Sequence, residues 1–278
     1  MRRHWLHCHV APASSLKGAR INRLLQSFVK NSLFSLQEFT HLLVAAFRNA
    51  FSPPRYYVDL LTQMDTIGVG SLPIVVLTGF FTGAILAAQT YRELQGFGET
   101  TLMGEAVALA AVRELGPVLT ALMVAGRNSS GIASELGSML VSEQVDAMRA
   151  LGTDPVRKLV TPRLYATLLT LPLLTILADF TALIGGWLVS VLIARVTGTE
   201  YWTKAYQSLD LHDVTQGLIK PVFFAVVVSL VGCYAGLTTT GGTEGVGRST
   251  TRAVVMASVW VLVLDLLITQ FLIGIHFA

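Results

Sequence analysis

The sequence predicts an all-α membrane protein with five transmembrane helices and, ahead of them, an amphipathic helix that lies in the membrane interface. Composition is the first observation: of the 278 residues, 53% are hydrophobic and only 13% are charged, whereas about 25% of residues are charged in a typical soluble domain. This balance excludes a disordered chain, a coiled coil and a disulfide scaffold, and it argues against an ordinary soluble enzyme. The two cysteines, Cys8 and Cys233, have no metal-binding spacing.

Five apolar runs are the second observation. A transmembrane helix needs about 20 mostly apolar residues, because the hydrocarbon core is about 30 Å thick. The runs cover residues 67–90, 103–126, 164–194, 218–240 and 253–278. Because a backbone in lipid must satisfy its own hydrogen bonds, and these runs are too long for barrel strands, each is predicted to be a helix. The chain is therefore divided into a five-span domain, residues 61–278, and a basic N-terminal segment, residues 1–60.

Lys and Arg residues gather on one side of the predicted membrane. Eight precede the first span, five lie between the second and third spans, and two lie between the fourth and fifth. The opposite side has three, which are Arg92, Arg195 and Lys204. Because cytoplasmic loops carry the excess of positive residues, the N-terminus is predicted in the cytoplasm and the C-terminus outside.

The interfacial helix is predicted within residues 19–51. Apolar residues such as Ile21 and Leu24 share one helical face, and basic residues such as Arg20 and Arg23 share the other. This pattern is typical of a helix in the membrane interface with its basic side chains toward anionic headgroups. A helix packed on a soluble partner is the alternative.

A short amphipathic helix is predicted over residues 142–151, in the cytoplasmic connection between the second and third spans. Its apolar face carries Val145, Met148 and Leu151, and its polar face carries Glu143, Asp146 and Arg149. Gly152 is expected to cap its C-terminus, and Asp154 and Pro155 to start the next helix. An apolar face outside the membrane indicates a docking element for a soluble partner; a surface helix that only closes the bundle is the alternative.

A series of motifs extends from the second span to the start of the fifth. They are Arg113-Glu114-Leu115-Gly116-Pro117, Ala125-Gly126-Arg127, Glu135-Leu136-Gly137, Glu143-Gln144-Val145-Asp146-Ala147-Met148, Leu151-Gly152-Thr153-Asp154-Pro155, Thr161-Pro162-Arg163 and Ser249-Thr250-Thr251-Arg252-Ala253-Val254-Val255. Together they resemble the permease of bacterial phospholipid ABC transporters, the MlaE/YrbE family. The resemblance extends from about residue 35 to the C-terminus.

The resemblance implies a homodimer in the bacterial inner membrane, with phospholipid held in a cavity between the two subunits. It implies two cytoplasmic ABC ATPase subunits, which bind ATP and Mg, and a periplasmic MCE-type lipid-binding protein. The helix at 142–151 corresponds to the family's coupling helix. No cofactor, metal or nucleic acid is expected for this chain.

Charges within the spans are the candidates for substrate binding. On insertion scales, a charge at the bilayer centre costs about 2.5–3.5 kcal/mol, so each one needs a reason. Arg113 and Glu114 lie about ten residues, or about 15 Å, into the second span, where Pro117 is expected to kink the helix. Transporters often place substrate sites at such interrupted helices.

The remaining charges are Lys220 in the fourth span, Asp179 in the third and Asp265 in the fifth. Lys220 is expected either to extend to the headgroups or to contact a lipid phosphate or Glu114. Asp179 and Asp265 are expected to be structural partners, and pairing of all these charges within the bundle is the alternative to a substrate site.

Apolar contacts to the lipid are assigned to Leu86 and Phe97. A nearby pattern of small residues, Gly79, Gly83 and Ala87, permits close helix contact, either within one chain or between two.

An intramembrane lipid-modifying enzyme is the rival function, with Glu114 and either Asp179 or Asp265 as acid and base. Residues 242–249 nearly match the sequence pattern of a phosphate-binding loop. However, Arg248 stands where the pattern requires lysine, and no predicted strand precedes the segment. This segment is therefore predicted to be a cytoplasmic turn, and ATP hydrolysis is assigned to a partner.

Overall fold

The computed structural model describes residue 37, residues 40–46, residue 48 and residues 56–276. The chain divides into two units, Met1–Val44 and Ala45–Ala278, and the second contains all of residues 56–276. The interfacial helix predicted within residues 19–51 falls mostly outside the described residues.

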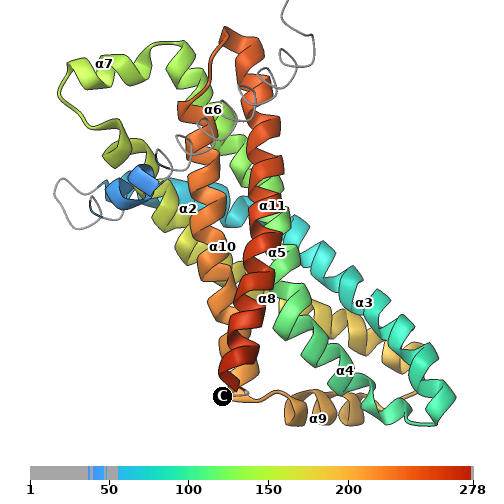
Figure 1. Cartoon of the computed structure of the whole chain (residues 1–278). Helices are drawn as coiled ribbons and strands as arrows, with labels where there is room; N and C mark the ends of the chain where they lie inside the picture. The colour runs from blue at the N-terminus through green and yellow to red at the C-terminus, as the bar shows by residue number, and fades with distance from the viewer. Residues whose placement is uncertain (1–36, 38–39, 47, 49–55, 277–278) are drawn as a thin grey trace, which may run out of the picture. The chain divides into compact units, whose positions relative to one another are not determined.

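In the described part of the chain, five helical segments are long and apolar enough to cross a membrane, which confirms the predicted all-α, five-span fold class. They are Tyr57–Phe97, Thr100–Val141, Val156–Leu192, Leu211–Leu237 and Gly242–Leu272. Each begins before its predicted first residue, because polar residues that flank the apolar runs continue the helices. The last two of these segments lie in α10 (Leu211–Leu237) and α11 (Gly242–His276), which are side by side (Figure 1).

The first segment is broken near its start. Helix α2 (Tyr57–Ile67) ends at Gly68, and the 3-10 turn η1 (Val69–Ser71) leads into α3 (Leu72–Phe97). Pro73 occupies the first turn of α3, where its missing N–H leaves no helical hydrogen bond unmade. The predicted first span therefore corresponds to α3, and α2 is an additional helix ahead of it.

The second segment contains two π-helical turns. Its elements are α4 (Met103–Ala110), η3 (Ala111–Leu115), α5 (Gly116–Val124), η4 (Ala125–Ser129) and α6 (Ser130–Val141). Pro117 has no N–H to give to the Arg113 carbonyl. In the adjoining turn η3, the Gly116 N–H instead bonds to the Ala111 carbonyl, five residues earlier. The predicted interruption is therefore a π turn, a feature that is frequent at functional sites.

The remaining elements include α7 (Gln144–Ala150), the π turn η5 (Val156–Val160), α8 (Thr161–Leu192) and α9 (Gly198–Ser208). The prediction of a turn over residues 242–249 was wrong, because this segment forms the first two turns of α11. The chain reverses just before it, where Gly241 and Gly242 adopt left-handed φ values of 92° and 66°. Left-handed backbone suits glycine, and the helix continues from there without a further break.

The small residues of α3 pack against α8. A β-carbon at Gly83 would overlap the carbonyl oxygen of Ala182, and one at Gly185 would overlap that of Phe80. Gly79 likewise faces Ala178. The contact between α3 and α8 is the most extensive between helices in the described part of the chain. The predicted small-residue seam therefore lies within one chain.

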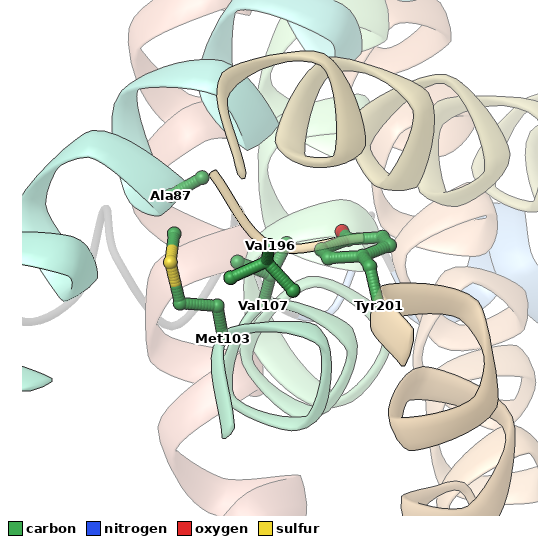
Figure 2. Packing of buried hydrophobic residues seen from close by; sticks show 5 residues of the cluster. All are labelled: Ala87, Met103, Val107, Val196 and Tyr201. Atoms are coloured by element: carbon green, nitrogen blue, oxygen red, sulfur yellow. The ribbon is translucent and has the colours of Figure 1, made fainter. Parts of the chain in front are cut away.

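Helix α9 is an amphipathic element between the third and fourth spans, for which the sequence analysis made no prediction. Its Tyr201 is fully buried and packs with Ala87 of α3, Met103 and Val107 of α4 and Val196, as Figure 2 shows. The Tyr201 hydroxyl donates a 3.2 Å hydrogen bond to the Leu183 carbonyl of α8. Tyr201 therefore anchors α9 to α3, α4 and α8.

Burial of the phenol makes this anchor sensitive to pH. Desolvation raises the pKa of Tyr201 above its usual value of 10.0. Because the folded-state pKa is raised, the stabilisation is fully present below about pH 10 and is lost as the pH rises further. We expect Tyr201→Phe to lose about 1 kcal/mol of stability at neutral pH, through the missing hydrogen bond. Thermal midpoints of the two proteins in detergent should converge above pH 10; a constant difference would contradict this expectation.

Candidate functional site

Four charged residues of the second, fourth and fifth spans meet at the π turn η3, and Lys220 lies at their centre. Its Nζ atom is 2.5 Å from Glu114 Oε2 and 3.1 Å from Asp265 Oδ1. It also donates a 3.1 Å hydrogen bond to the carbonyl of Arg113, which is the carbonyl that Pro117 cannot engage. Glu114, Lys220, Asp265 and Arg113 are referred to below as the Lys220 cluster.

Close contact between two helices brings these groups together. A β-carbon at Gly217 of α10 would overlap the carbonyl oxygen of Val112 in η3, so the glycine lets the backbones approach. Lys220 follows three residues later, nearly one helical turn along the same face. Its side chain is fully buried, so the expectation that it extends to the headgroups was wrong, and pairing with Glu114 is the arrangement found.

Arg113 is turned toward a residue that sequence reasoning missed. Its Nε atom donates a 2.7 Å hydrogen bond to Asp213 Oδ1, and the Asp213 side chain is only 2% exposed. Asp213 lies in the first turn of α10, where it forms a capping box with Asp210. The signal was present in the sequence, since an acidic residue three positions after an N-cap residue, just before an apolar run, is typical of a capping box.

The cluster presents one positive and one negative group at the surface of the chain. The side chains of Arg113 and Glu114 are 44% and 42% exposed, whereas their partners Asp213 and Lys220 are 2% and 0% exposed. Each exposed charge is therefore held by a buried counter-charge. Fixed, oppositely charged groups of this kind can bind a zwitterionic ligand without rearrangement.

Asp265 is a structural partner, as expected, but Asp179 is not. The Asp179 carboxylate lies against Gly116, where it leaves no room for a β-carbon. Among the described residues, its Oδ1 atom accepts no hydrogen bond and it forms no ion pair with the Lys220 cluster. In the same part of the chain, no three His, Cys, Asp or Glu side chains are close enough to share a metal ion.

The two apolar candidates, Leu86 and Phe97, lie in different places relative to the cluster. Leu86 lines a small apolar cavity between α3, η3, α5 and α8, together with Leu119 and with Leu115, the residue that follows Glu114. Phe97 is the last residue of α3 and is 83% exposed. Leu86 therefore lies beside the turn that carries Arg113 and Glu114, whereas Phe97 does not line this cavity.

The helix predicted over residues 142–151 is present as α7, but its exposed face is not the apolar face that was predicted to dock a partner. Its C-terminus has the expected cap: Gly152 has a φ of 77°, and Thr153 N–H bonds to the Met148 carbonyl. Val145 is fully buried within its own chain, so it is unable to contact a partner directly, whereas Leu151 is 83% exposed. Around Leu151 the exposed surface is polar: Glu143, Asp146 and Arg149 are exposed, and the last two form a 2.8 Å ion pair.

Comparisons with known proteins agree with this architecture. The family described as Permease MlaE matches residues 60–271. A probable ABC transporter permease protein of Rickettsia bellii is 41% identical over 253 residues, which is 91% of this chain and 95% of that protein. A probable ABC transporter permease protein of Synechocystis is 42% identical over 197 residues, 71% of this chain and 75% of that protein.

A third relative has a more specific name. The intermembrane phospholipid transport system permease protein MlaE of Haemophilus influenzae is 38% identical over 221 residues, 79% of this chain and 85% of that protein. The family match covers the five spans and the Lys220 cluster, and the relatives are matched over most of their length. The chain is therefore a multi-pass membrane permease that belongs to the MlaE family.

Proposed function

We propose that this chain is the permease subunit of an ABC transporter that moves phospholipids between the inner membrane and a periplasmic lipid-binding partner. The observation that carries the proposal is the pair of half-exposed opposite charges, Arg113 and Glu114, each held by a buried counter-charge on α10. The name of the Haemophilus relative supports phospholipid as the cargo.

The Lys220 cluster would bind the lipid headgroup. The guanidinium of Arg113 suits a phosphate, since its fork of N–H donors matches phosphate oxygens. The carboxylate of Glu114 suits the ammonium of a zwitterionic headgroup. Exposed side chains near Lys220 in α10 and near Asp265 in α11 are apolar and suit acyl chains; they are Ile219, Val222, Phe223, Leu262 and Leu266.

The proposed transporter contains several partner proteins besides this chain. Two copies form a homodimer with the lipid between them, two ABC ATPase subunits bind ATP and Mg, and an MCE-type protein receives or delivers lipid in the periplasm. The distribution of Lys and Arg supports a cytoplasmic N-terminus and a periplasmic C-terminus. Helix α7 would receive the movement of the ATPase. A two-residue turn connects α7 to α6, the last helix of the second spanning segment, which also carries Glu114.

The test is lipid transfer in reconstituted vesicles. We expect Glu114→Gln to assemble normally and to reduce ATP-dependent transfer about tenfold or more, because a charge-assisted contact with the headgroup is lost. Glu244→Gln is the matched control, since Glu244 is 83% exposed and, within the part of the chain that the structure describes, forms an ion pair only with Arg248 on its own helix. Transfer at the wild-type rate by Glu114→Gln would refute the assigned role.

The same preparation tests the rival enzyme. Mass spectrometry of lipids incubated with the purified chain, without ATP or partners, should detect no new product. A product that disappears in Glu114→Gln would favour the intramembrane enzyme instead.

Docking of the ATPase is tested at Leu151. We expect Leu151→Asp to reduce co-purification of the ATPase, because it places a charge in the exposed apolar contact of the α7 segment. Leu211→Asp is the matched control, since Leu211 is equally exposed at 83% but is the first residue of α10, at the opposite end of the spans. Equal yields of ATPase with both variants would contradict the assignment.

A further inference from the structure

A cavity with several polar lining residues lies between α2 and the junction of η4 and α6, and none of its lining residues belongs to the Lys220 cluster. Its volume is about 200 Å³, and its polar lining residues are Gln63, Thr66, Arg127, Asn128 and Glu135. Arg127 is 14 residues after Arg113, which places it roughly 20 Å farther along the second helical segment. Each arginine lies in a π turn, η3 or η4, and π turns are frequent at functional sites.

Arg127 is fixed at this cavity with donors to spare. Its Nη1 atom donates hydrogen bonds to the Thr66 carbonyl at 3.0 Å and to Ser71 Oγ at 3.2 Å. Among the described residues, no hydrogen bond engages its Nε or Nη2 atoms. The guanidinium lies on Gly70, where a β-carbon would come within 2.5 Å of Nη2. The positive group is therefore held in place, and part of its hydrogen-bonding capacity is unused.

Asn128 adds a buried donor without an acceptor. The residue is only 5% exposed, and its Nδ2 atom has no hydrogen-bond partner among the described residues. Its Oδ1 atom accepts a long 3.4 Å hydrogen bond from Arg127 Nη1, which orients the amide. Buried donors are almost always satisfied in folded proteins. The unpaired Nδ2 atom therefore points to an acceptor group that completes the site.

Among the described residues, Glu135 is the one carboxylate that lines the cavity, and its charge is neutralised. Glu135 Oε2 is 2.9 Å from Nη2 of Arg163, whose side chain is only 4% exposed. Arg163 is held in turn by the Leu159 carbonyl. With Glu135 paired, the cavity retains the positive charge of Arg127.

We propose that this cavity, referred to below as the Arg127 cavity, binds a phosphate group. A tetrahedral anion would accept hydrogen bonds from the free guanidinium N–H groups and from Asn128 Nδ2, as the donor set requires. The phosphate comes from a lipid headgroup or from free phosphate, because both present the same oxygens. Neither source depends on headgroup binding by the Lys220 cluster.

The experiment is titration calorimetry on the purified full-length chain in non-ionic detergent. The Arg113→Gln background removes the other headgroup contact, so that failure of the proposed function and failure of this site are distinguishable. The probes are inorganic phosphate and dihexanoyl phosphatidic acid, each titrated separately. In this background we expect Arg127→Gln and Asn128→Asp each to weaken binding about tenfold or more.

Two further variants separate binding from folding. Gly70→Ala retains every charge but displaces the guanidinium, and we expect it to weaken binding as well. Gly126→Ala is its matched control, because nothing lies within 4 Å of the added β-carbon. The elution profile and the thermal midpoint identify any variant that fails to fold. The binding measurements on the variants that do fold then test the proposal.

The outcomes are distinct. Binding of both probes, or of the lipid alone, with loss in Asn128→Asp and Gly70→Ala, supports a headgroup site. Binding of inorganic phosphate alone, with the same losses, supports a site for a soluble phosphate. No binding of either probe, or binding that is unchanged in those variants, would overturn the proposal.

Discussion

Lys220→Met is expected to abolish transport and to cost about 3–5 kcal/mol of stability, because it removes one partner from a buried ion pair. The substitution leaves Glu114 and Asp265 next to each other without their shared cation, and it leaves the Arg113 carbonyl without a donor. The charge of Lys220 is fully buried, so solvent does not compensate for its loss. The thermal midpoint of the purified chain in detergent measures the effect.

A triple variant separates the structural role from the transport role. Replacing Lys220 by Met together with Glu114→Gln and Asp265→Asn removes all three charges, so we expect most of the stability to return. Transport should stay absent, because Glu114 no longer offers a charge to the headgroup. Lys204→Met in α9 is the control for loss of a lysine. A Lys220→Met protein that melts like the wild type would show that the ion cluster is not important for stability.

Gly83→Ala is expected to be the most damaging of the small substitutions, at about 1–3 kcal/mol or more. The added β-carbon would overlap the backbone carbonyl of Ala182, and a backbone atom is unable to move aside as a side chain can. Helices α3 and α8 must therefore separate along their extensive contact. The yield of monodisperse protein and its thermal midpoint are the measurements.

Gly96→Ala provides the matched comparison in the same helix. Nothing lies within 4 Å of a β-carbon at Gly96, so only the helix propensity changes. Alanine is favoured over glycine within a helix by about 1 kcal/mol, and Gly96→Ala should be neutral or stabilising. If both variants behave alike, close packing of α3 on α8 is not what requires Gly83.

The sequence by itself determined the features that depend on neighbouring residues. The lengths of the apolar runs specified five spans, and Gly152, Asp154 and Pro155 specified where α7 ends and where the next helix begins. Pro117 marked the interruption of the second span. These features follow from local backbone chemistry and from the thickness of the bilayer, so they are readable without knowledge of the packing.

Only the tertiary structure decided which side chains meet. Lys220 is buried because Gly217 brings α10 against η3, and Arg113 pairs with Asp213, 100 positions along the chain. Val145 is buried against its own chain, although its position on the helix suggested docking. Asp179 was expected to be a structural partner, but its Oδ1 atom has no hydrogen-bond partner among the described residues. Helical periodicity states which residues share a face, but not what covers that face. The element that covers a helical face is determined by contacts between segments far apart in the sequence, and such contacts leave no local sequence pattern.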